Sequence, residues 1–244
     1  MTRIPFIARL RAALRALASV ILLTAPAAAI EGGDLAGRNR LSQATVGIGT
    51  LTVGSDAIGV SRCSGVLIAP QLVLTAAHCV RGDPLASAIV LYNGATPARP
   101  AIPVATIARY DLVADDLPPD YGNLLTLSLD TAVLRLARPV KGRAPIPIAR
   151  AARPPRSLRL EGAGLSEEGI GVLKATELEP LLMTSTGLIV AATRGSEVCK
   201  GDSGGPVVAD GPGGPQLWGV ASAVLTTSGA CGNIVVIAPA SPKV

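Results

Sequence analysis

The sequence predicts an all-β protein, and two observations carry that prediction. First, 20 prolines and 27 glycines in 244 residues argue against a helical bundle. Second, short runs rich in β-branched residues alternate with turn-forming residues along the chain. Nearly half of the residues are apolar but only 2% are aromatic, so the core must be built from small aliphatic side chains.

The apolar runs predict strands in two groups, separated by a proline-rich and arginine-rich stretch over 138–157. The first group comprises 44–51, two strands joined by a proline turn within 63–79, then 89–92 and 101–108. The second group comprises 158–165, 175–185, 188–192, 216–223 and 234–237. Residues 52–62 are predicted to be turn-like, and the aspartate-rich segment 111–123 a surface loop.

The first 29 residues have the pattern of a secretory signal peptide. Arg3, Arg9, Arg11 and Arg15 precede an apolar run that ends in Ala27-Ala28-Ala29. The apolar run is too short to span a bilayer, which requires about 20 residues; a short membrane anchor is the alternative. Removing the segment leaves 18 basic against 17 acidic residues, a net charge of about +1. The chain therefore lacks the basic face that a nucleic-acid-binding protein needs.

The chain has four cysteines, Cys63, Cys79, Cys199 and Cys231. An even number in an exported protein indicates disulfides, with three alternative connectivities, and hence an oxidising compartment. There is no Cys-x-x-Cys pair and only one histidine in the chain, so the sequence does not predict a metal site.

The run Gly201-Asp202-Ser203-Gly204-Gly205-Pro206 predicts a nucleophilic serine. Its glycines can adopt dihedral angles closed to other residues and so turn amide N–H groups towards a point beside the Ser203 hydroxyl. Such N–H groups stabilise the oxyanion of an acyl-transfer reaction. A serine needs a base, and His78 is the sole histidine. The letters Gly-x-Ser-x-Gly also occur in esterases, but there a helix follows the serine and the histidine comes later in the chain.

The strings GDSGGP and TAAHC together resemble the trypsin-like (chymotrypsin-fold) serine proteases. The run 63–79 also resembles the family pattern CGGxLIxxxxVLTAAHC, and Ile30-Glu31-Gly32-Gly33 resembles its mature start. The resemblance implies two six-stranded antiparallel β-barrels, residues 30–143 and 144–244, with a C-terminal helix that is short or absent. It also implies the disulfides Cys63–Cys79 and Cys199–Cys231.

The resemblance further implies the catalytic roles. Ser203 is the nucleophile, His78 its base and Asp130 the group that orients the imidazole. Asp130 lies in an apolar run similar to the family's Asp-Ile-Ala-Leu-Leu-Arg-Leu, whereas Asp111, Asp115, Asp116 and Asp120 lie in polar surroundings. The N–H groups of Gly201 and Ser203 form the oxyanion hole. A freed Ile30 amine pairs with Asp202 on activation.

By the same resemblance Glu197, Ser222 and Val224 line the primary substrate pocket. An acid at the base of that pocket would bind an arginine or lysine side chain. However, Glu197 is longer than the family's aspartate, and Val224 stands where a glycine is usual. A shallow pocket for small side chains, or a Glu197 turned to solvent, are the alternatives.

The sequence therefore predicts a secreted or periplasmic serine endopeptidase, with a possible preference for basic residues. It is expected to be a monomer that acts on polypeptides, without a cofactor, nucleic acid or stable membrane contact after signal removal. The alternatives are a protease-like protein that binds without cleaving, and an esterase.

Overall fold

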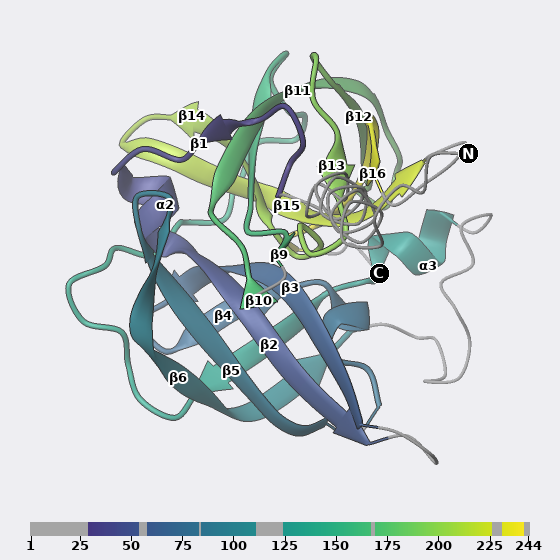
Figure 1. Cartoon of the computed structure of the whole chain (residues 1–244). Helices are drawn as coiled ribbons and strands as arrows, with labels where there is room; N and C mark the ends of the chain where they lie inside the picture. Colours follow the sequence, from purple (N-terminus) through teal and green to yellow (C-terminus); the bar gives the residue numbers. More distant parts are fainter. Residues whose placement is uncertain are drawn as a thin grey trace, which may run out of the picture.

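A computed structural model describes residues 29–53, 58–82, 84–110, 124–166, 169–225 and 231–241. Within these ranges the protein consists of antiparallel strands with two short α-helices, α2 (Arg40–Ala44) and α3 (Leu124–Ser128), and the 3-10 helix η2 (Ala77–Val80). The strands form two barrels, one below the other in Figure 1. This confirms the predicted fold class.

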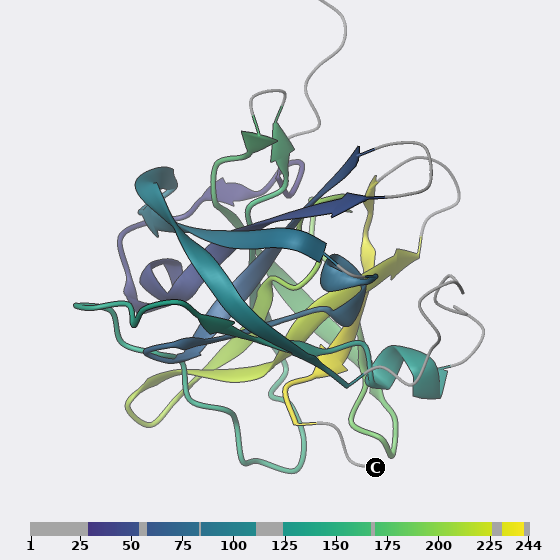
Figure 2. The same ribbon diagram turned by 90° about the horizontal axis from the view of Figure 1, so that it is seen from below.

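Six strands close the first barrel. In spatial order they are β2 (Thr45–Val53), β3 (Ile58–Ala69), β4 (Leu72–Thr75), β7 (Ala132–Leu136), β6 (Thr96–Arg109) and β5 (Pro84–Asn93). Gly65 lets the strands approach, because a Cβ there would lie 2.8 Å from both Ile48 Cδ1 and Val73 Cγ1. Viewed from below, this barrel lies in front of the second (Figure 2).

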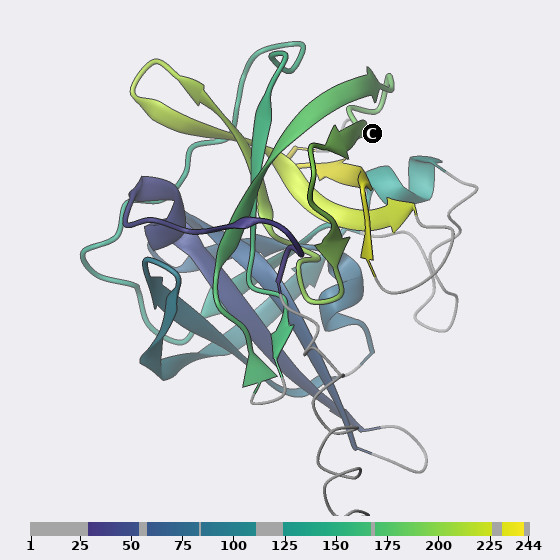
Figure 3. The same ribbon diagram turned by 45° about the horizontal axis from the view of Figure 1, so that its top comes forward.

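Six strands also close the second barrel, through pairing of its first and second strands. In spatial order they are β8 (Leu158–Gly162), β11 (Lys174–Met183), β12 (Ile189–Thr193), β17 (Ile234–Pro239), β15 (Gly214–Leu225) and β14 (Pro206–Gly211). The N-terminal strand β1 (Asp34–Leu35) adds to β11, so the start of the described chain lies on the second barrel (Figure 3). Two short pairs complete the fold, β9 (Leu165–Ser166) with β10 (Gly169–Ile170) and β13 (Val198–Cys199) with β16 (Cys231–Gly232).

The apolar core of the first barrel continues across the contact between the barrels. Val46, Ile48 and Leu134 share one cluster of buried residues with Leu217 and Val220 of the second barrel. A separate cluster fills the second barrel and includes Ile30, which is fully buried. The two barrels therefore share a largely apolar contact, and polar groups buried there need partners.

The structure differs from the sequence prediction at the connection between β2 and β3. The turn predicted over 52–62 is wrong at both ends, because β2 continues to Val53 and β3 begins at Ile58; residues 54–57 lie outside the described residues. Thr52, Val53 and Val60 are β-branched and favour extended backbone, which the turn prediction underweighted. The predicted loop 111–123 and the signal segment up to residue 28 lie outside the described residues. After β17 the described chain ends at residue 241 without a helix.

Candidate active site

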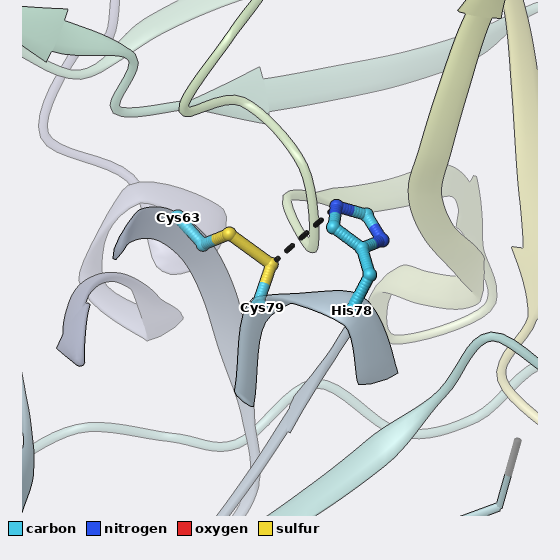
Figure 4. A group of neighbouring side chains, drawn as sticks. All are labelled: Cys63, His78 and Cys79. Atoms are coloured by element: carbon cyan, nitrogen blue, oxygen red, sulfur yellow. Dashed lines mark hydrogen bonds between the residues drawn. A yellow bond between two sulfur atoms is a disulfide. The ribbon is translucent and has the colours of Figure 1, made fainter. Parts of the chain in front are cut away.

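His78 is held at the edge of the first barrel by the disulfide between Cys63 and Cys79. Strand β4 ends at Thr75, and the short helix η2 then carries His78 and Cys79, while Cys63 lies in β3. Figure 4 shows the imidazole beside this disulfide, with Nε2 3.9 Å from Cys79 Sγ. The side chain is 25% exposed, so a substrate can reach it.

Asp130 lies behind His78. Its carboxylate is buried, and Oδ2 lies 2.8 Å from His78 Nδ1, while Oδ1 accepts the His78 main-chain N–H at 2.9 Å. The Ser222 hydroxyl donates to the same Oδ2 at 2.6 Å. Burial raises the pKa of Asp130, but these hydrogen bonds and the charge of His78 outweigh it and hold the pKa below its usual value. An ionised carboxylate at Nδ1 keeps the proton there and leaves Nε2 as the basic atom.

Ser203 reaches the same place from the second barrel. Gly201 and Gly204 flank it with φ of +94° and +80°, values that favour glycine. A Cβ on Gly204 would lie 2.2 Å from the Ser64 carbonyl, so only glycine fits between the loop and the first barrel. The Ser203 carbonyl lies 3.7 Å from Cys79 Sγ. Within the described part of the chain, no hydrogen bond joins Ser203 Oγ to His78 Nε2.

Some N–H groups of the loop around Ser203 have a main-chain acceptor among the described residues, and others have none. The N–H groups of Asp202, Gly204 and Gly205 donate to main-chain carbonyls at 2.7–3.1 Å. Among the described residues, the N–H groups of Gly201 and Ser203 have no such acceptor. Two unpaired donors beside a serine hydroxyl are suited to stabilise an oxyanion.

Ile30 and Asp202 are also brought together. The Ile30 nitrogen donates to Asp202 Oδ2 at 3.0 Å, and the Cys199 N–H donates to the same atom at 2.9 Å. In this chain Ala29 precedes Ile30, so the donor is a peptide N–H. Asp202 is fully buried, and burial raises its pKa to about 7 against the opposing effect of these N–H groups.

The residues expected to line the substrate pocket lie in different environments. Glu197 is exposed and exchanges two main-chain hydrogen bonds of 2.8 Å with Glu31. This corresponds to the alternative in which Glu197 faces solvent. The Ser222 hydroxyl contacts Asp130, so it supports that carboxylate. Val224 is partly buried against the core of the second barrel.

Two clusters have the donor types that bind metals, Cys63 with His78 and Cys79, and Glu31 with Cys199 and Cys231. All four cysteines are in disulfides with the two predicted pairings, so no thiolate is free to bind an ion.

Sequence reasoning missed two buried polar residues at the contact between the barrels. Ser64 lies between the histidine loop and the serine loop, at a position where the family pattern has glycine. Glu161 is fully buried in β8, and its Oε2 lies at hydrogen-bond distance, 3.0 Å, from the Thr45 hydroxyl of the first barrel. An acid inside the apolar run 158–165 was the available signal for the second residue.

Comparisons with known proteins place these features in a family. The family model described as Trypsin matches residues 42–242. Transmembrane protease serine 9 of Rattus norvegicus is 31% identical over 184 residues, which cover 66% of this chain but 17% of the rat protein. Trypsin of Saccharopolyspora erythraea is 32% identical over 186 residues, 67% of this chain and 76% of that protein. No helix among the described residues is long and apolar enough to cross a membrane.

Two solved structures share the fold. HL collagenase aligns with a TM-score of 0.66 and 22% identity over 86% of this chain and 93% of its own. Mouse neuropsin, a serine protease expressed in the limbic system, aligns with a TM-score of 0.61 and 22% identity over 84% and 93%. From the family model and the barrels together, the chain belongs to the trypsin family of serine endopeptidases.

Proposed function

We propose that the protein cleaves peptide bonds with Ser203 as nucleophile, His78 as base and Asp130 as the group that orients the base. The observation that carries the proposal is the buried Asp130 carboxylate 2.8 Å from His78 Nδ1, next to the loop that carries Ser203. Ser203 Oγ attacks the substrate carbonyl, and His78 Nε2 takes the hydroxyl proton. His78 then returns that proton to the leaving amine, and water repeats the sequence on the acyl-enzyme.

The N–H groups of Gly201 and Ser203 are the proposed oxyanion hole. Their support is that both lack a main-chain acceptor among the described residues, whereas the N–H groups of Asp202, Gly204 and Gly205 each have one. Negative charge develops on the substrate oxygen in the tetrahedral intermediate, and two fixed donors stabilise it without reorganising solvent.

The experiment is labelling with a fluorophosphonate probe, followed by peptide mapping and incubation with a mixed peptide library. We expect one labelled residue, Ser203, and no labelling or cleavage in Ser203→Ala. Ser185→Ala, an exposed serine in the turn between β11 and β12, is the matched control and should behave as wild type. Labelling without any peptide cleavage would favour an esterase. A folded protein that neither labels nor cleaves would favour a protease-like binding protein.

We infer a secreted or periplasmic location and a monomeric state. Both disulfides need an oxidising compartment, and the first 29 residues have the pattern of an export signal. Cell fractionation and light scattering test the two points. Recovery of the mature protein from the cytoplasm, or a stable dimer, would contradict them.

A preference for arginine or lysine substrates is a separate part of the proposal and depends on Glu197. Its exposure means that solvent screens the carboxylate, so we expect only a modest preference. Glu197→Gln should lower kcat/KM for a lysine substrate relative to the matched alanine substrate. Glu179→Gln, an exposed acid in β11, is the control. An unchanged ratio in Glu197→Gln would assign the pocket to small side chains.

A further inference from the structure

Ser64 connects the first barrel to both sides of the candidate nucleophile. It follows Cys63 in β3 and is fully buried. Its main-chain N–H donates to the Ser203 carbonyl at 2.8 Å, and its hydroxyl donates to the Gly201 carbonyl at 2.9 Å. The Ala163 N–H donates to the same hydroxyl at 2.9 Å, and the Thr75 hydroxyl donates to the Ser64 carbonyl at 2.7 Å.

These contacts use every hydrogen-bonding group of Ser64 in a consistent sense. A serine hydroxyl has one proton to donate and lone pairs that accept. The Gly201 carbonyl can only accept and the Ala163 N–H can only donate, so the direction of both hydrogen bonds is fixed. The hydroxyl therefore ties the loop before the nucleophile to the turn after β8.

We propose that Ser64 is a positioning residue for the oxyanion hole; this inference rests on the proposed function of Ser203. The N–H of Ser203 belongs to the peptide plane between residues 202 and 203. The planes on either side of it carry the Gly201 and Ser203 carbonyls, and Ser64 holds both. Fixing two neighbouring planes restricts the orientation of the one between them, and hence the direction in which the Ser203 N–H points.

Ser64 adds to the main-chain hydrogen bonds within the loop, where the Asp202 carbonyl accepts the Gly205 N–H at 2.9 Å. Gly201, at φ +94°, has no side chain to restrict its backbone. It packs against the turn after β8, where a Cβ on Gly201 would lie 2.5 Å from the Gly164 carbonyl carbon. That turn is Gly162-Ala163-Gly164, so it has no large side chain to hold it. The Ser64 hydroxyl supplies a polar connection at this point.

The test compares ligands that do and do not place an oxyanion in the site. A peptide aldehyde adds to Ser203 and forms a hemiacetal oxygen, whereas the same peptide with a terminal alcohol binds without that bond. In Ser64→Ala and Ser64→Gly we expect the ratio of their affinities to fall about tenfold. This is less than the loss for removal of one oxyanion donor, because the donor is misdirected and not deleted. The kcat should fall by a similar factor, with KM within about twofold.

The control variant is Ser87→Ala, which removes a buried serine hydroxyl that bonds Thr50 in the first barrel, away from the nucleophile loop. It should lower stability without changing the aldehyde-to-alcohol ratio. All values are normalised to the fraction of enzyme that a fluorophosphonate titrates.

The outcomes separate the two proposals. A wild-type protein that does not label at Ser203 refutes the proposed function itself. Normal labelling with an unchanged ratio in both Ser64 variants refutes only the role of Ser64. The same loss of the ratio in Ser87→Ala, or failure of both Ser64 variants to fold, makes Ser64 a purely structural residue and overturns the inference.

Discussion

Replacing the buried Glu161 by glutamine should stabilise the protein in alkaline solution. Glu161 is fully buried between the barrels, and burial raises its pKa to about 7, against the opposing effects of the Thr45 hydroxyl and Arg159. The Thr45 hydroxyl lies 2.9 Å from the Leu41 carbonyl and 3.0 Å from Glu161 Oε2. With one proton it can donate to only one of them, so a protonated Glu161 can donate through Oε2 to Thr45 while Thr45 donates to the Leu41 carbonyl. Glu161 Oε1 has no hydrogen-bond partner among the described residues.

The size and sign of the effect follow from the pKa. The ordinary value for this carboxyl group is 4.5, and a move to about 7 corresponds to about 3 kcal/mol. The folded state binds the Glu161 proton more tightly than the unfolded state does. The stabilisation from the protonated Glu161 is therefore fully present below pH 4.5 and is lost as the pH rises to about 7. Glutamine has an N–H group that can donate to Thr45 at every pH, so Glu161→Gln should keep this stabilisation as the pH rises.

The measurement is the free energy of unfolding in urea at pH 4 to 9. We expect wild type and Glu161→Gln to be similar at pH 4, and the variant to be more stable by up to about 3 kcal/mol at pH 8. Asp202 is present in both proteins, so its own pH dependence cancels in the difference. Glu179→Gln, at an exposed site, controls for the general loss of an acid. A difference that does not change with pH would refute a protonated Glu161.

Three further predictions follow from the site and the disulfides. Ser222→Ala removes the 2.6 Å hydrogen bond to Asp130, so the Asp130 pKa should rise. The free energy of unfolding above pH 4 should fall by about 1.5–3 kcal/mol, measured in urea at pH 7. An unchanged free energy of unfolding would contradict a stabilising role for this hydrogen bond. Joint replacement of Cys199 and Cys231 by alanine opens a loop of 32 residues and should lower the free energy of unfolding by about 3–4 kcal/mol in the same assay. A much smaller decrease would mean that this loop is already restricted in the unfolded chain without the disulfide. N-terminal sequencing of active secreted enzyme should begin at Ile30, and full activity with an added alanine ahead of it would end the proposed Ile30–Asp202 activation.

The sequence predicted best those features that depend on short, continuous segments of the chain. The all-β class follows from short apolar runs between turn-forming residues, whereas the two disulfide pairings and the role of Asp130 were implied by the family resemblance. Strand ends were predicted less well: the β2–β3 hairpin is longer than expected because β-branched residues extend it on both sides.

What the sequence could not give depends on pairs of residues far apart in the chain. Ser64 and Gly201 are 137 residues apart, and Thr45 and Glu161 are 116 apart, yet each pair meets at the contact between the barrels. Local patterns carry no information on such pairs. The sequence does not decide between the alternatives for Glu197 for the same reason, because its main-chain partner, Glu31, is far away in the chain.

Neither disulfide joins one barrel to the other, and this has a consequence for fragments of the protein. Cys63–Cys79 closes a loop in the first barrel and Cys199–Cys231 a loop in the second, so only the polypeptide between β7 and β8 links the two halves covalently. Arg150, Arg153 and Arg156 in that connection are exposed to proteases. A cut there leaves two fragments, each closed by a disulfide and held to the other by the apolar contact and by the pairing of β1 with β11, with His78 on one and Ser203 on the other. Catalysis by a nicked sample would then report reassociation, and should depend on its concentration once the fragments are separated and remixed.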